Sequence, residues 1–306
     1  MSAVSNTQTW FITGAGGGFG LELTRQLLAL GKQVAATTRA SFDALNALQA
    51  QYPRQLWVSK LDVTELDSIA PVIKAAHEHF GSIDVLVSNA GYVLLGALEE
   101  LEPEQIHRQL QTNLYGPIFL IRAMLPYMRQ QKHGRIIQLS SEAGQITFPA
   151  LSLYHASKWG IEGFCESVAR EVAAFDIHIT IVQPGRASTD IDEHAQTSVG
   201  QLPAYQQSTV GLYRKLLTMG RFPSIGDPVK IATRIIEAAQ APQPPLRLAL
   251  GEDAYKNISR ALQERLQQLE AQKDVACSTS RTDGIDQRPP QTTPRPSICQ
   301  THKKSG

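Results

Sequence analysis

A run of glycines near the N-terminus places the strongest constraint on the fold of this chain. Residues 9–13 (TWFIT) form a short, apolar, β-rich run that leads directly into residues 14–20 (GAGGGFG). The leucines that follow recur at helical spacing up to Gly31. A strand, a glycine turn and a helix together bring backbone N–H groups and a helix N-terminus to a phosphate. A plain flexible turn is the alternative, and the flanking elements argue against it.

A second chemical signal lies between residues 140 and 158. Tyr154 and Lys158 are four residues apart and share one face of a helix. The ordinary pKa of a tyrosine is about 10, and a neighbouring ammonium lowers it. Ser141 follows a strand-like run, 135–139, which allows its hydroxyl to meet Tyr154. The three groups suit proton transfer to or from a carbonyl or alcohol oxygen, although Tyr-x-x-x-Lys by itself is also compatible with an ordinary helix face.

The spacing of the glycines is informative in detail. The Gly-x-Gly-x-x-Gly fingerprint fails, because Phe19 stands where its last glycine would be. Two other patterns fit: Thr13-Gly14-x-x-x-Gly18-x-Gly20, and a Gly-x-x-Gly-x-x-Gly pattern that starts at Gly14. The first is typical of compact and the second of extended members of the short-chain dehydrogenase/reductase superfamily, which the chain resembles once the Tyr-x-x-x-Lys motif is added.

A tripeptide decides between the two branches. The apolar run 83–88 ends in Asn-Ala-Gly at 89–91, which resembles the signature of the compact members. Extended members lack it as a rule and carry a C-terminal substrate domain. The continuation of the Tyr-Lys helix, residues 160–167 (GIEGFCES), resembles the retinol and 17β-hydroxysteroid dehydrogenase branch.

The resemblance covers roughly residues 9–250 and implies an α/β fold. The expected architecture is a doubly wound Rossmann domain with a seven-stranded parallel sheet, order 3-2-1-4-5-6-7, and helices on both faces. The implied catalytic residues are Asn113, Ser141, Tyr154 and Lys158. The implied cofactor-binding residues are Gly14, Gly18, Phe19, Gly20, Thr38, Arg39, Asp62, Asn89, Gly91, Tyr154, Lys158, Pro184, Gly185 and Thr189.

The resemblance also implies a role for each catalytic residue. Ser141 hydrogen-bonds the carbonyl oxygen, and Tyr154 exchanges a proton with it. Lys158 lowers the pKa of the phenol and binds the nicotinamide ribose hydroxyls. Asn113 kinks its helix and holds a water that links the lysine to solvent.

The end of the second expected strand, 33–38, bears on the choice of cofactor. An acidic residue there would bind the adenosine ribose, whereas an arginine would meet a 2′-phosphate. Here Thr38 is followed by Arg39 without a carboxylate, which favours NADPH over NADH, although Arg39 is also compatible with a solvated surface position. The glycine loop lacks the second basic residue that many NADP-preferring members carry. Asp62 resembles the aspartate that reaches the adenine amino group, and it is also a candidate N-cap for the helix 65–80.

Several helices carry local expectations. Ser41 is the expected N-cap of a helix at 41–51. The helical stretch 104–131 is expected to bend near Gly116-Pro117, because proline is poorly tolerated inside a helix. This stretch and the helix 153–175 are the expected interface of a homo-oligomer, either a dimer or a tetramer.

Composition excludes several other classes of protein. The net charge of +1 gives no reason to expect nucleic acid or an anionic membrane as partner. Cys165, Cys277 and Cys299 form no C-x-x-C pair, so neither a disulfide framework nor a zinc site is indicated. No apolar run approaches the ~20 residues of a membrane span, and residues 1–9 lack an apolar signal core. A cytoplasmic protein without a membrane anchor is expected.

The sequence also predicts a domain plan and a substrate class. Residues 1–273 are expected to form one domain, with a substrate lid at 186–227 whose apolar residues also suit ordinary helix packing. Residues 274–306 are polar enough to be disordered. Apolar residues at 92–95 and 146–151 flank the expected site, which favours a small lipophilic ketone, aldehyde or alcohol as substrate. An NADP(H) sensor without turnover and an extended-type nucleotide-sugar epimerase or dehydratase are the alternatives.

Overall fold

The computed structural model describes residues 7–189 and 195–280. Contacts divide the chain into two units, of which the first ends at Leu262 and the second begins at Gln263. The boundary lies inside helix α9 (Glu252–Glu270), and the single domain expected at 1–273 stays a prediction. None of the helices in the described ranges is long and apolar enough to cross a membrane.

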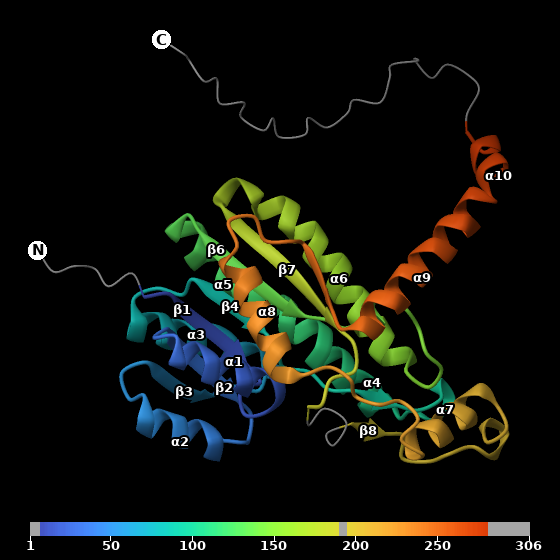
Figure 1. The fold of residues 1–306 in the computed structure, drawn as a ribbon, viewed down its shortest axis with the longest axis horizontal. Coiled ribbons are helices and arrows are strands. Elements are labelled where there is room, and N and C mark those ends of the chain that lie inside the picture. The colour runs from blue at the N-terminus through green and yellow to red at the C-terminus, as the bar shows by residue number, and fades with distance from the viewer. Residues whose placement is uncertain (1–6, 190–194, 281–306) are drawn as a thin grey trace, which may run out of the picture. The chain divides into compact units, whose positions relative to one another are not determined.

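Seven parallel strands form the central sheet of the first unit (Figure 1). They lie in the order β3-β2-β1-β4-β6-β7-β9, which confirms the predicted topology. Their bounds are β1 (Thr9–Thr13), β2 (Gln33–Thr38), β3 (Leu56–Lys60), β4 (Val85–Ser88), β6 (Gly134–Leu139), β7 (Ile177–Pro184) and β9 (Arg247–Leu250). The strand order reverses between β1 and β4, and ligands of such sheets bind in the crevice at the carboxyl ends of the strands near this reversal.

Helices cover both faces of the sheet (Figure 1). One face packs against α1 (Gly18–Ala29), α2 (Asp43–Gln51) and α8 (Pro228–Gln240), and the other against α3 (Leu66–Phe80), α5 (Gly116–Gln131) and α6 (Ser152–Val172). Within β1, Trp10 and Ile12 face the first layer and Phe11 faces the second, and all three are fully buried. Burial on both faces explains why the strands appear in the sequence as continuous apolar runs.

The long helical stretch that carries Asn113 is interrupted by a wide turn. Helix α4 (Pro103–Leu110) passes into the π-helical turn η2 (Gln111–Tyr115) and then into α5. Pro117 lacks the N–H that would bond the carbonyl of Asn113 in an α-helix, and the wider turn accommodates this loss. The irregularity therefore lies one turn before the Gly116-Pro117 position that the sequence predicted. Such turns are frequent at functional sites.

The 186–227 segment contains short elements beside the sheet. Strand β8 (Gln196–Thr197) pairs in parallel with β5 (Leu94–Leu95), and the helices η5 (Pro203–Tyr205) and α7 (Thr209–Thr218) follow. The sequence did not predict the β5–β8 pair, because two-residue strands are too short to show an alternating pattern.

Two predicted helix caps were wrong. Helix α2 begins at Asp43 after Phe42, without a side-chain cap, so Ser41 does not cap it. The N-cap position of α3 is held by Glu65. Asp62 instead closes the turn before that helix, where it accepts hydrogen bonds from the backbone N–H of Thr64 at 3.0 Å and from its hydroxyl at 2.7 Å.

The C-terminal prediction needs one correction. Helix α9 (Glu252–Glu270) is followed by α10 (Lys273–Ser278), which occupies the start of the segment predicted to be disordered. Residues 274–278 are therefore helical in the structure, where the sequence predicted disorder. The remainder of that prediction, 281–306, lies outside the described residues together with Cys299.

Candidate active site

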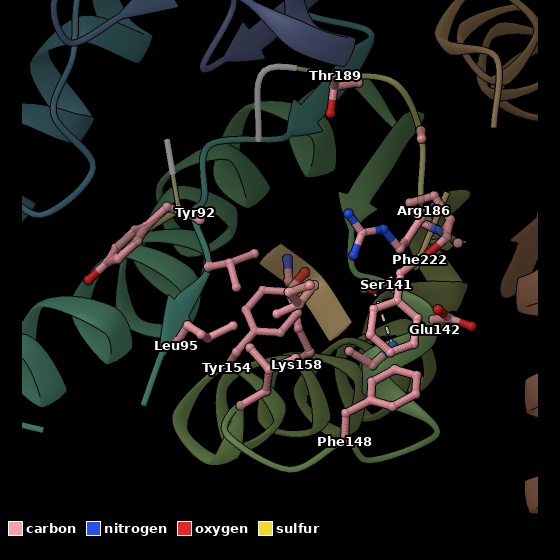
Figure 2. Close-up of a pocket in the computed structure, with 18 of the residues that line it drawn as sticks. Tyr92, Leu95, Ser141, Glu142, Phe148, Tyr154, Lys158, Arg186, Thr189 and Phe222 are labelled. Carbon is pink, nitrogen blue, oxygen red and sulfur yellow. Dashed lines mark hydrogen bonds between the residues drawn. The ribbon is translucent and has the colours of Figure 1, made fainter. Parts of the chain in front are cut away.

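A cavity of about 870 Å³ lies at the carboxyl ends of the strands (Figure 2). Nine of the predicted site residues line it: Phe19, Asn89, Gly91, Ser141, Tyr154, Lys158, Pro184, Gly185 and Thr189. The other predicted residues, Gly14, Gly18, Gly20, Thr38, Arg39, Asp62 and Asn113, lie outside its lining. Four of these contact residues of the lining: Gly18 faces Thr189, Gly14 and Gly20 lie against Asn89, and Asn113 bonds Tyr92.

The predicted proton-transfer groups lie together on the cavity wall. Figure 2 shows Tyr154 and Lys158 next to each other, and Ser141 also lines the cavity. Tyr154 and Lys158 are 7% and 6% exposed, and the lysine Nζ lies 5.7 Å from the centroid of the phenol ring. Lys158 donates a hydrogen bond to the carbonyl of Leu139 at 2.9 Å. Strand β6 thus delivers Ser141 and also anchors the lysine.

Two opposing effects act on the pKa of Lys158. Burial lowers the pKa of this lysine to about 8, and the negative charge of Glu162 opposes that effect. The ammonium form still predominates at pH 7, because the pKa lies about one unit higher. A positive charge close to a phenol favours the phenolate. The placement of a lysine beside a phenol suits proton exchange at an oxygen atom.

A histidine fixes the loop between Ser141 and Tyr154. His155 Nε2 accepts a hydrogen bond from the N–H of Phe148 at 2.7 Å, and Nδ1 lies 2.9 Å from the carbonyl of Ala143. Burial lowers the pKa of His155. A neutral ring that donates at Nδ1 satisfies both contacts. The sequence gave no signal for this role, since a single histidine inside the Tyr-x-x-x-Lys motif has no informative spacing.

Two asparagines hold the strand ends around the cavity. The Asn113 carboxamide bonds both backbone groups of Tyr92, with distances of 3.1 Å from the Tyr92 N–H and 2.9 Å to its carbonyl. Asn89 Nδ2 donates to the carbonyls of Thr13 at 2.9 Å and Gly14 at 3.1 Å, which ties β4 to β1. Asn113 thus supports the loop after β4. The water relay that the resemblance implies for it stays a prediction.

The glycine turn fits the diphosphate of a dinucleotide. Helix α1 begins at Gly18 without a side-chain cap and without an acidic residue in its first turn, so its N–H groups are available to an anion. Gly14 has a φ of +66°, which favours glycine. A Cβ on Gly20 would collide with the carbonyl oxygen of Gly14 and would lie 2.7 Å from Asn89 Nδ2. The turn is therefore closely packed against Asn89, and its residue Phe19 lines the cavity.

The remaining predicted cofactor residues, Thr38, Arg39 and Asp62, lie at or just after the ends of β2 and β3. Arg39 Nε lies 4.0 Å from Asp62 Oδ2, and the arginine side chain is 55% exposed. Partial burial acts to raise the pKa of Asp62, but hydrogen bonds from Thr64 and the charge of Arg39 hold it below its ordinary value. Thr38 is buried beside Gly16, where a Cβ would lie 2.7 Å from its hydroxyl. The contacts of Arg39 and Asp62 with an adenosine stay a prediction.

The other half of the cavity has apolar walls. Tyr213 links an aromatic row, with ring centroids 6.0 Å from Phe148 and 5.2 Å from Phe222. Of the apolar residues that the sequence placed beside the site, Tyr92, Val93, Leu95, Phe148 and Leu151 line the cavity, whereas Leu94 and Ile146 do not. The 186–227 segment adds Tyr213, Leu217, Phe222, Pro223 and Ile225 to this wall.

Sequence reasoning missed a polar wall of the same cavity. Asn257 Nδ2 donates to Glu142 Oε2 at 2.8 Å, and Asp253 Oδ2 accepts from the Arg186 N–H at 2.9 Å. Burial raises the pKa of Glu142. Asp253 and Asn257 are four residues apart on α9, and this i, i+4 spacing was the available signal. Their partners follow β6 and β7, and only the fold brings them to α9.

A buried ion pair fastens the 186–227 segment beside the cavity. The Glu100 side chain is fully buried and pairs with both terminal nitrogens of Arg214, on α7. It also accepts hydrogen bonds from the N–H groups of Ala97 at 2.8 Å and Leu202 at 2.9 Å. The hydrogen bond from Arg214 is the main reason why the pKa of Glu100 falls from 4.5 to about 2.

Replacing Glu100 by Gln is expected to lower the free energy of unfolding by about 3 kcal/mol at pH 7, because a buried guanidinium loses its counter-charge. In the wild type this stabilisation is complete above about pH 4.5 and is lost as the pH falls toward about 2, because the folded state depresses the pKa. Thermal unfolding at pH 7 and pH 3 measures both effects. The exposed neighbour Glu99 provides the control, since Glu99→Gln should change stability little. Equal stability of the two variants at pH 7 would contradict the assignment.

Comparison with known proteins agrees with this geometry. Residues 8–199 match the family model described as short chain dehydrogenase. The oxidoreductase BOA17 of Botryotinia fuckeliana is 36% identical over 83% of this chain and 93% of its own. Human retinol dehydrogenase 8 is 34% identical over 78% of this chain and 80% of its own. A short-chain dehydrogenase structure from Streptomyces avermitilis superposes with a TM-score of 0.83 at 34% identity, covering 90% of this chain and 100% of that one. The chain belongs to the short-chain dehydrogenase family of oxidoreductases.

Proposed function

We propose that this protein interconverts a lipophilic carbonyl compound and its alcohol with NADP(H). The observation that carries the proposal is the placement of Ser141, Tyr154 and Lys158 on one wall of a cavity. Phe19 of the glycine turn lines that cavity on one side, and an aromatic row lines it on another. The first side suits a dinucleotide, and the second suits an apolar substrate.

The chain's own residues perform the proton chemistry. When bound, the nicotinamide cofactor supplies or accepts the hydride that is exchanged at the substrate carbon. In reduction, Tyr154 gives its phenolic proton to the carbonyl oxygen, to which Ser141 donates a hydrogen bond. Lys158, held by the Leu139 carbonyl, stabilises the resulting phenolate through its charge. One hydride and one proton together convert the carbonyl to the alcohol, and oxidation reverses both transfers.

Arg39 supports a preference for NADPH. It is largely exposed at the end of β2, where a 2′-phosphate would lie, and Asp62 leaves most of its donors available. Arg39→Ala is expected to weaken NADPH binding about tenfold, the loss of one charge-assisted hydrogen bond, with little effect on NADH. Cofactor fluorescence titrations measure both constants. Arg54→Ala, which removes an exposed arginine outside the site, is the control. Equal losses for the two cofactors would argue against a phosphate contact.

The walls of the cavity support a lipophilic substrate. The aromatic row offers apolar surface to a substrate, and a relative that is 34% identical is named a retinol dehydrogenase. The test measures NADPH and NADH consumption against aldehydes and ketones of increasing size and apolar area. Turnover that rises with apolar area and prefers NADPH is expected. Cofactor binding without turnover on the whole series would instead favour a sensor.

A further inference from the structure

Glu162 is a buried carboxylate that the mechanism above does not use. It is 2% exposed and lies four residues after Lys158 on α6, so the two side chains share one face of the helix. An ionised carboxylate is costly to bury unless it is paired and hydrogen-bonded. The groups around Glu162 therefore show what holds its charge in place.

Donors from four parts of the fold converge on this carboxylate. They are the hydroxyl of Ser140 at 2.7 Å, the side-chain amide of Gln145 at 2.5 Å, the side-chain amide of Gln183 at 2.8 and 3.0 Å to the two oxygens, and Arg247 Nε at 3.5 Å. Ser140 follows strand β6, and Gln145 follows the short helix η3 (Glu142–Gly144). Gln183 is the last residue but one of β7, and Arg247 is the first residue of β9. Glu162 thus joins the strand ends that present Ser141 and Pro184 to the cavity.

The negative charge of Glu162 acts on two cationic side chains, Arg247 and Lys158. Arg247 also pairs with Glu166, whose carboxylate is closer to the guanidinium, at 2.7 Å. The Glu166 side chain is more exposed than that of Glu162. Burial raises the pKa of Cys165 to about 12, so the neighbouring thiol is neutral. Glu162 is the charged group that acts against the effect of burial on Lys158.

We propose that Glu162 is a positioning residue for the proposed reaction, in which its negative charge keeps Lys158 protonated and its hydrogen bonds hold the ends of β6 and β7 around the reacting atoms. This inference rests on the proposed function, because Lys158 matters only if the site binds a cofactor and transfers protons. The role of Glu162 is exerted through Lys158 and the strand ends, without contact to the substrate.

The decisive variant is Glu162→Gln, which removes the charge and keeps the shape. Loss of a nearby negative charge favours the deprotonated forms of both Lys158 and Tyr154. The high-pH limb of kcat for reduction should therefore move to lower pH by about one unit. The loss of NADPH affinity at high pH should shift in the same direction, measured by cofactor fluorescence without any turnover. Glu166→Gln is the matched control, since it removes the other carboxylate that contacts Arg247.

The outcomes separate the inference from the proposed function. The inference is supported if the pH profiles of kcat and of NADPH affinity move to lower pH in Glu162→Gln and stay as in the wild type in Glu166→Gln. Wild-type profiles in both variants would overturn it, because the network would then be merely structural. If Glu162→Gln does not fold, Glu162→Asp keeps the charge at a greater distance from Lys158. An intermediate shift then supports the inference, and an unchanged profile overturns it. A wild-type protein that neither binds NADPH nor turns over would overturn the proposed function, and the inference with it.

Discussion

Replacing Tyr154 by Phe is expected to lower kcat for carbonyl reduction by roughly 10²–10⁴-fold, the usual contribution of a positioned acid. The phenol is the group that can give a proton to the substrate oxygen, while Ser141 and Lys158 respectively orient that oxygen and supply charge. The hydroxyl is not part of the glycine turn, so the NADPH dissociation constant should change little. Steady-state kinetics and cofactor fluorescence on the same preparation measure the two effects separately.

A control substitution in the same cavity distinguishes the loss of the acid from a general change in packing. Phe148 lines the apolar wall beside Tyr213, so Phe148→Leu should raise KM for large apolar substrates and leave kcat within a few-fold. A Tyr154→Phe enzyme that retains most of its kcat would refute the assignment of the phenol as the acid.

Replacing Gly20 by Ala is expected to weaken NADPH binding by roughly 100-fold, or about 2.8 kcal/mol of binding free energy. The added Cβ would collide with the Gly14 carbonyl oxygen and would press on Asn89, so the turn and the bond that ties β4 to β1 must both shift. Overpacking of this kind also costs about 1–3 kcal/mol of folding free energy. Cofactor titration and thermal unfolding measure the two losses.

Gly163 offers a control for this change. It lies inside helix α6, and a Cβ there would meet nothing within 4 Å. Gly163→Ala should leave NADPH binding unchanged and stabilise the helix by up to about 1 kcal/mol. If Gly20→Ala behaved like Gly163→Ala, the close approach of bare backbone to the cofactor would not be a feature of this site.

The sequence predicted the parts of the site that depend on local spacing. Tyr154 and Lys158 share a helix face, the glycines follow a strand directly, and Asn-Ala-Gly ends another strand. In a parallel sheet, these patterns place the glycine turn and the proton-transfer groups at the same edge, where the strands end. The seven-stranded order followed from the same information combined with the family resemblance.

The parts that the sequence did not predict depend on contacts between distant segments. Glu100 and Arg214 are 114 residues apart, and Glu142 and Asn257 are 115 apart. Nothing in the local pattern pairs such residues, and each one alone is compatible with an ordinary exposed polar side chain. The two wrong helix caps have a similar cause, because Ser41 and Asp62 are suitable cap residues whose chain geometry the tertiary fold determines.

In the proposed reaction, hydride is transferred to a carbonyl carbon with Tyr154 as the acid. The most direct test incubates the protein with an apolar ketone and NADPH deuterated at both hydrogens of nicotinamide C4, followed by mass spectrometry of the product. We expect one deuterium on the carbinol carbon with the wild type and almost none with Tyr154→Phe. Cofactor binding with no labelled alcohol from any ketone or aldehyde in the series would contradict the account.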